Sequence, residues 1–250
     1  MGGNTAIGHC AGCGRLLLLS LVFLLLPLAA CNAPDPTLKP ASSADQLPGQ
    51  SHAAVARADG VHAVVETSAW PADPSVATKL TPLHVRIEND SKAPILLLYR
   101  KFALVGPEGQ YYSALPPVAA HIDLADSETD LPPDPPVSSL SFHHQGFFVA
   151  PFYSYAYGKL PVWRHPFHHD DAYHKTFHTT YKQLNIPAAE LKAWALPEGV
   201  IASGGSLSGY LYFEHVDPAL NRVELRGDIV HAETGQTLGT LVIPFTIQRH

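Results

Sequence analysis

The chain carries little charge, and basic residues are the scarcer kind. Charged residues make up 15% of its 250 residues, against roughly a quarter in ordinary globular proteins. The formal net charge of −6 argues against a protein that binds nucleic acid by neutralising phosphates. Hydrophobic residues still reach 46%, which excludes extended disorder for the chain as a whole. The 23 prolines and 18 glycines make a helical bundle a poor expectation and favour turn-rich β structure.

Cysteine is also scarce, with three in the chain. Cys10 and Cys13 form a Cys-x-x-Cys pair, but they precede a long apolar run in a segment that we expect to be removed. A redox or zinc-binding role for this pair is therefore not expected. The remaining Cys31 cannot form an internal disulfide alone, so the mature domain must be stabilised by its apolar core.

The apolar run covers Leu16 to Leu28 and reads LLLLSLVFLLLPL. A membrane-spanning helix needs about 20 apolar residues, so this run fits the shorter core of a signal peptide. Arg15 supplies a positive charge directly before it. The run ends in Leu28-Ala29-Ala30-Cys31, which resembles the lipobox of bacterial lipoproteins.

This resemblance implies that residues 1–30 are a signal peptide and that Cys31 becomes the first mature residue. Its thiol would then carry fatty acyl chains such as palmitate and anchor the protein in a membrane. Asn32, in place of an aspartate at that position, implies the outer membrane of a two-membrane bacterium. We expect the anchored domain to face the periplasm.

Residues 31–60 are rich in Pro, Ala and Ser and show no periodic apolar pattern. We interpret them as a tether that holds the folded domain about 30 Å from the bilayer, since a flexible chain spans about 5–6 Å times the square root of its length.

From residue 61 onward, short alternating apolar segments bounded by turn residues predict an antiparallel β-sandwich. One short helix is expected over 187–196, with Leu191, Trp194 and Ala195 as its buried stripe. The expected strands are 61–66, 83–88, 95–104, 110–112, 207–214, 222–231 and 237–247. The expected core residues are Val85, Ile87, Leu97, Leu211, Phe213, Leu225, Ile229, Leu241 and Ile243.

Several short sequence stretches of this region resemble those of bacterial cell-envelope lipoproteins of uncharacterised role that have an immunoglobulin-like domain. The resemblance covers residues 60–126 and 182–250 and implies an immunoglobulin-like sandwich for 61–250. The residues that carry it are the strand Leu83–Asn89, the stretch Tyr112-Ser113-Ala114-Leu115-Pro116-Pro117, the stretch Ala195-Leu196-Pro197-Glu198-Gly199-Val200, and Ser208-Gly209-Tyr210-Leu211-Tyr212-Phe213.

A segment over about 123–181 fits neither half of this pattern, and we predict a long irregular insertion there. Residues 142–181 contain 12 of the 23 aromatic residues and 7 of the 15 histidines, with no clear period of 2 or 3.6. Such a segment can be a flap that packs over an open face of the sandwich. It can also be a surface that binds an envelope protein partner, because Tyr and Trp give large contact area at low entropy cost.

The same segment contains a tract of imidazoles and carboxylates between residues 163 and 178. These side chains are ligands of Zn²⁺, Cu²⁺ or Ni²⁺ when three or four converge. If 170–178 is helical, three of them lie on one helix face. The candidate metal ligands are His165, His168, His169, Asp170, His174 and His178. No His-Glu-x-x-His motif is present, so solvated or packed histidines are the competing interpretation.

Catalytic motifs are absent from the sequence. The stretch Gly204-Gly205-Ser206-Leu207-Ser208-Gly209 is close to a nucleophile elbow, but neither of its windows satisfies Gly-x-Ser-x-Gly. We interpret it as a turn that enters a strand. The sequence therefore predicts a lipid-anchored envelope protein with a non-enzymatic binding or structural role. Periplasmic metal binding through the tract at 165–178 is the alternative, and a hydrolase is the third interpretation.

Overall fold

The computed structural model describes residues 37–67, 70–116, 142–184 and 188–248, which belong to one compact unit, Pro34–His250. Its first strands are β1 (Thr37–Pro40), β2 (Asp45–Gln46), β3 (Ala53–Ala58), β4 (Val61–Glu66), β5 (Leu80–Asn89) and β6 (Ile95–Leu97). They are followed by β7 (Phe102–Val105), β8 (Tyr111–Leu115), β9 (His143–Val149), β10 (Gly199–Glu214), β11 (Arg222–His231) and β12 (Thr237–Gln248). The helices are α1 (Pro74–Ala77), α2 (Asp171–Leu184) and α3 (Ala188–Trp194), with 3₁₀ turns η1 (Tyr99–Lys101) and η3 (Pro151–Tyr153).

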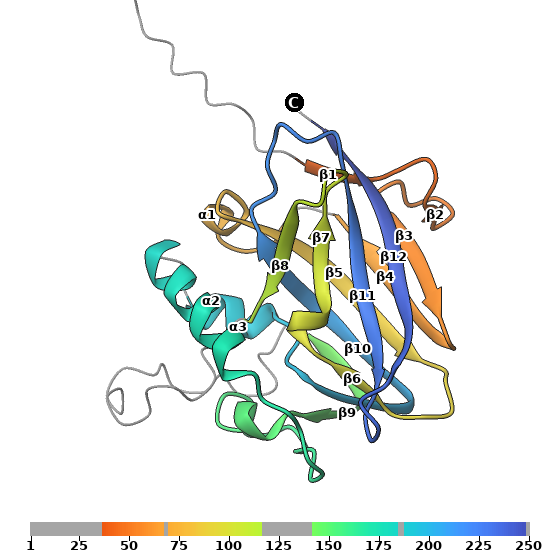
Figure 1. The fold of residues 1–250 in the computed structure, drawn as a ribbon, viewed down its shortest axis with the longest axis vertical. Coiled ribbons are helices and arrows are strands. Elements are labelled where there is room, and N and C mark those ends of the chain that lie inside the picture. The colour runs from red at the N-terminus through yellow and green to blue at the C-terminus, as the bar shows by residue number, and fades with distance from the viewer. Residues whose placement is uncertain (1–36, 68–69, 117–141, 185–187, 249–250) are drawn as a thin grey trace, which may run out of the picture. The chain divides into compact units, whose positions relative to one another are not determined.

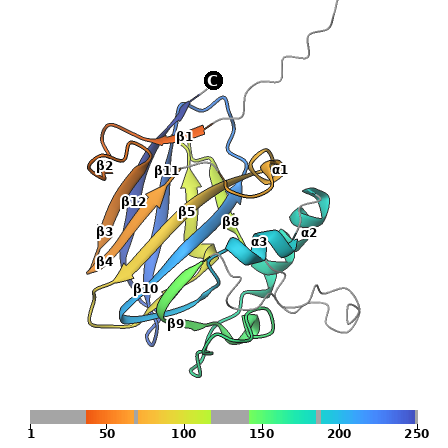
Figure 2. The same ribbon diagram turned by 180° about the vertical axis from the view of Figure 1, so that it is seen from behind.

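The described part of the chain is mainly β, and its strands form one antiparallel sheet (Figures 1 and 2). The strand order is β1-β12-β11-β7-β8-β10-β5-β4-β3-β2, with β6 and β9 pairing off this path. The long strand β10 is central, because it pairs with β5, β6, β8 and β9. Its length lets one strand connect the two halves of the sheet.

The larger of two apolar clusters in the described residues contains residues from both ends of the sheet. Gly239 of β12 lies against Ala58 of β3, so closely that a Cβ on the glycine would be 3.1 Å from that of the alanine.

The alternation of apolar residues in the sequence predicted the core correctly. All nine expected core residues are buried: Val85, Ile87, Leu97, Leu211, Phe213, Leu225, Ile229, Leu241 and Ile243.

The expected strands are present, except that 95–104 is not one continuous strand. It is interrupted by η1, between β6 and β7. At the interruption the backbone amide of Tyr99 donates to Oε1 of Glu198 at 2.8 Å, and the Tyr99 side chain is buried. A long-range polar contact thus replaces the ladder hydrogen bond that the apolar run predicted.

The tether prediction is wrong from residue 37 onward, while residues 1–36, with Cys31, lie outside the described residues. Strand β1 pairs with β12, and β3 pairs with β4. Leu38, Ala54 and Ala56 are buried in the main apolar cluster. The alternation in β3 consists mostly of alanines, which contribute too little apolar surface to be distinguished from a Pro/Ala/Ser linker in the sequence.

The expectation of one short helix and an irregular insertion is also wrong in part. Helix α3 confirms the helix expected over 187–196, but the described chain has two more, α1 and α2. The insertion contributes strand β9, which pairs with β10, and its side chains Phe147 and Tyr153 are fully buried. Aromatic residues without a period fill the core here because they come from a strand, a 3₁₀ turn and loops in succession. Of the described helices, none combines the length and apolar character needed to cross a membrane.

Candidate functional site

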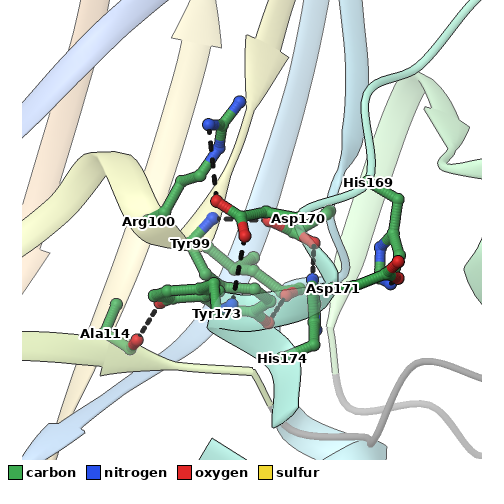
Figure 3. A network of polar contacts seen from close by, with 10 residues as sticks. Tyr99, Arg100, Ala114, His169, Asp170, Asp171, Tyr173 and His174 are labelled. Carbon is green, nitrogen blue, oxygen red and sulfur yellow. Dashed lines mark hydrogen bonds and ion pairs between the residues drawn. The ribbon is translucent and has the colours of Figure 1, made fainter. Parts of the chain in front are cut away.

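The first part of the predicted ligand tract lies at the start of helix α2. Asp170 is the N-cap: its Oδ1 accepts from the backbone amide of Tyr173 at 3.1 Å, and its carbonyl accepts from the amide of His174 at 3.1 Å. Its Oδ2 lies 3.7 Å from Nη1 of Arg100 (Figure 3). Asp170 is thus a helix cap that also ties α2 to η1, which accounts for its carboxylate without a metal.

The next turn of α2 anchors the helix through His174. Its side chain is 2% exposed, and its Nε2 lies 3.3 Å from Oε2 of Glu198, which is 3% exposed. The other carboxylate oxygen of Glu198 accepts from the amide of Tyr99, and the Glu198 carbonyl accepts from the amide of Ala150 at 2.9 Å. Glu198 therefore connects α2, η1 and the end of β9. Breaking such a buried pair is costly, because the remaining partner is left uncompensated.

Several polar atoms around this pair lack hydrogen-bond partners in the described part of the chain. They are the hydroxyl of Tyr153, the Nδ1 atoms of His169 and His174, and Oε2 of Glu198, whose contact with His174 is close but misaligned. Burial raises the pKa of Tyr153, and the nearby carboxylate of Glu198 raises it further. The rings of His169 and His174 are stacked with centroids 4.5 Å apart. Burial, followed by the neighbouring His174, lowers the pKa of His169.

The structure does not gather the predicted ligands into one described metal site. His165 and His168 are exposed, His169 and Asp170 are half-buried, and His174 is buried. His169 pairs instead with Asp171, at 3.1 Å. His178 lies in α2, but its side chain is outside the described residues. The complete ligand set therefore stays a prediction.

One other group of potential ligands lies at the end of strands β4 and β5. His62, Glu88 and Asp90 offer ligand atoms within 4.8 Å of one another. However, Nη2 of Arg86 lies 2.5 Å from Oε1 of Glu88, and Arg57 is directly opposite His62 in the register. The contacts of Arg86 with Glu88 and of His62 with Asp90 are those of surface pairs, and we assign no metal to the group.

Sequence reasoning missed a different arrangement, on the outer face of β4, β5 and β10. Oε2 of Glu66 lies 3.3 Å from Nδ1 of His84, and Nε2 of His84 lies 3.1 Å from Oγ of Ser208. Glu66 and His84 are separated by 18 positions, and His84 and Ser208 by 124. The one signal in the sequence was Ser208 in the Gly-Ser stretch. Its partners could be found only from strand register, which no spacing motif encodes.

No protein-family model matches this chain, nor does any curated protein or solved structure.

Proposed function

We propose that this chain is a lipid-anchored cell-envelope lipoprotein, held in the outer membrane through acyl chains on Cys31 and acting there by binding or by structural support. The observation that carries the proposal is the apolar run that ends in Leu28-Ala29-Ala30-Cys31. One acyl chain gives only marginal membrane binding, and stable attachment requires a second signal or chain. The proposed acyl chains on Cys31, being more than one, would supply this stable attachment.

We further infer that the β domain is an immunoglobulin-like sandwich. Support comes from the single antiparallel sheet and from one apolar cluster that takes residues from both ends of that sheet. The approach of Gly239 to Ala58 also supports it, since strands β12 and β3 are not paired in the sheet order. Sandwich domains of this kind commonly serve as binding or structural modules, which agrees with the proposed role.

The test of anchoring is metabolic labelling with a radioactive or alkyne-tagged palmitate, followed by separation of soluble and membrane fractions. The chain should incorporate the label and sediment with membranes, and Cys31→Ala should lose both properties. Cys10→Ala and Cys13→Ala are matched controls, because both cysteines lie in the segment expected to be removed. Label and membrane attachment retained in Cys31→Ala would overturn the proposal.

Metal binding by the tract at 165–178 is the second candidate function. The observation in its favour is the pair of buried, unpartnered Nδ1 atoms on His169 and His174. Calorimetric titration of Zn²⁺, Cu²⁺ and Ni²⁺ into a tag-free protein tests it. Stoichiometric binding tighter than micromolar that is lost in His174→Ala and His178→Ala would support it. Weak, multi-site binding that both variants retain would refute metal binding by this tract.

A further inference from the structure

The outer face of three adjacent strands brings Glu66, His84 and Ser208 together. Glu66 of β4 is directly opposite His84 of β5, and His84 is directly opposite Tyr210 of β10. Ser208 is two positions before Tyr210, so its side chain emerges on the same face. The neighbours Leu207 and Leu211 point the other way and are fully buried. The register of a folded sheet, and not a flexible loop, therefore positions all three groups.

The hydrogen-bond chain has the order of a nucleophile, a base and an orienting carboxylate. With its proton on Nδ1, the His84 ring donates to Oε2 of Glu66, and the lone pair of Nε2 accepts from the Ser208 hydroxyl. The ring of Tyr210 packs against that of His84 with centroids 5.2 Å apart, which restricts the imidazole. Burial raises the pKa of Tyr210, and the charge of Glu66 adds to this. His84 and Glu66 remain 29% and 37% exposed, so solvent and small reactants can reach them.

Cationic and polar side chains surround Ser208 on both neighbouring strands. Arg86 of β5 is directly opposite it on one side, and His143 of β9 on the other. The backbone of β10 is paired on both edges at this position, so a negative charge developing on a substrate must be stabilised by side chains. Arg86 is the donor placed for this, although its guanidinium also contacts Glu88.

We propose that Ser208 is a nucleophile activated by His84 and oriented through Glu66, and that this face transfers acyl groups from carboxylic esters. Oγ of Ser208 forms a bond to the ester carbonyl carbon while His84 takes the hydroxyl proton. The bond to the alkoxy group then breaks, and His84 returns the proton to the leaving alcohol. Water attacks the acyl-serine in the same way, so that ester and water give acid and alcohol. This chemistry goes beyond the binding role proposed above.

The experiment combines ester hydrolysis with covalent labelling of the full-length protein. A p-nitrophenyl acetate assay measures turnover, and a fluorophosphonate followed by peptide mapping identifies the modified residue. We expect the label on Ser208 and a rate that falls at least about 100-fold in Ser208→Ala and His84→Gln, the range for loss of a general base. Ser206→Ala is the matched control, since Ser206 lies on the same strand and face and should keep the wild-type rate.

Glu66 is a positioning residue, and its test separates orientation from folding. Glu66→Gln should lower the rate with an unchanged melting temperature, and Glu66→Asp should restore part of it. Labelling at residues other than Ser208, or an equal rate in Ser208→Ala with melting preserved, would overturn the proposal.

Discussion

Two of the regions that place histidines beside carboxylates differ in solvent exposure and in how their residues are brought together. In residues 142–181 the histidines are close in sequence, and the structure buries one of them, His174, against Glu198 of a later segment, so that both side chains are nearly inaccessible to solvent. On the outer face of the sheet, Glu66, His84 and Ser208 are distant in sequence but aligned by register, and they remain reachable. The aromatic-rich segment thus contributes to the core, while the proposed catalytic groups come together through strand register.

The largest effect is expected from deleting residues 142–181 with a short Gly-Ser bridge. The deletion removes β9 and eight members of the main apolar cluster: Phe142, Phe147, Val149, Ala150, Tyr153, Ala156, Tyr157 and Leu160. The remaining chain should show no cooperative unfolding by calorimetry. Tyr111→Ala removes an aromatic ring that is 59% exposed and should melt like the wild type. Cooperative unfolding of the deletion variant would show that the segment is peripheral to the fold and not part of its core.

A smaller but still large loss is expected from Glu198→Ala. The variant leaves His174 and the Tyr99 amide without their buried partner, so the free energy of unfolding should decrease by about 3–5 kcal/mol. Glu224→Ala is the matched control, because Glu224 forms an exposed ion pair with Arg226 and such pairs contribute about 0–1 kcal/mol. Urea unfolding of both variants measures the difference. Equal losses would show that Glu198 does not connect the elements as described.

Alkaline titration probes the same segment through Tyr153 and Tyr157. Burial raises the pKa of both phenols in the folded protein above the ordinary value near 10. In the unfolded chain they ionise at the ordinary value, so the unfolded state releases protons first as the pH rises. The stabilisation is therefore complete below pH ~10 and decreases above it. Absorbance near 295 nm should show a group of phenols that ionises only on unfolding, and gradual ionisation of all ten tyrosines without unfolding would contradict it.

The smallest effect concerns the cap of α2. Asp170→Ala removes the side-chain acceptor of the Tyr173 amide, and such losses typically cost about 1 kcal/mol. Asp170→Asn keeps an oxygen at the cap and should lose less, although it weakens the contact with Arg100. Thermal melting of the two variants measures the order. If the two variants lost the same stability, the ion pair with Arg100, which both remove, and not the cap would be the stabilising contact.

The sequence predicted those parts of the fold that depend on local alternation. The strands of residues 61–66, 207–214 and 222–231 and all nine core residues follow from apolar periodicity, and the helix over 187–196 follows from the residues that start and end it. Strand β3 was missed because alanine contributes little to that pattern. Strand β9 was missed because its own residues show no strand periodicity and its conformation depends on pairing with β10. The contact of His84 with Ser208 depends on the register of β5 against β10, which no local property of either strand determines.

The most direct test compares phosphonate labelling per folded molecule in His174→Ala and His84→Gln. The two regions are proposed to differ in kind, with the first stabilising the fold and the second carrying the chemistry. His174→Ala should melt several degrees lower, at about 2–4 °C for each kcal/mol lost, while its folded fraction labels Ser208 at the wild-type rate. His84→Gln should melt as the wild type does and lose labelling. Labelling lost in His174→Ala and kept in His84→Gln would contradict the account.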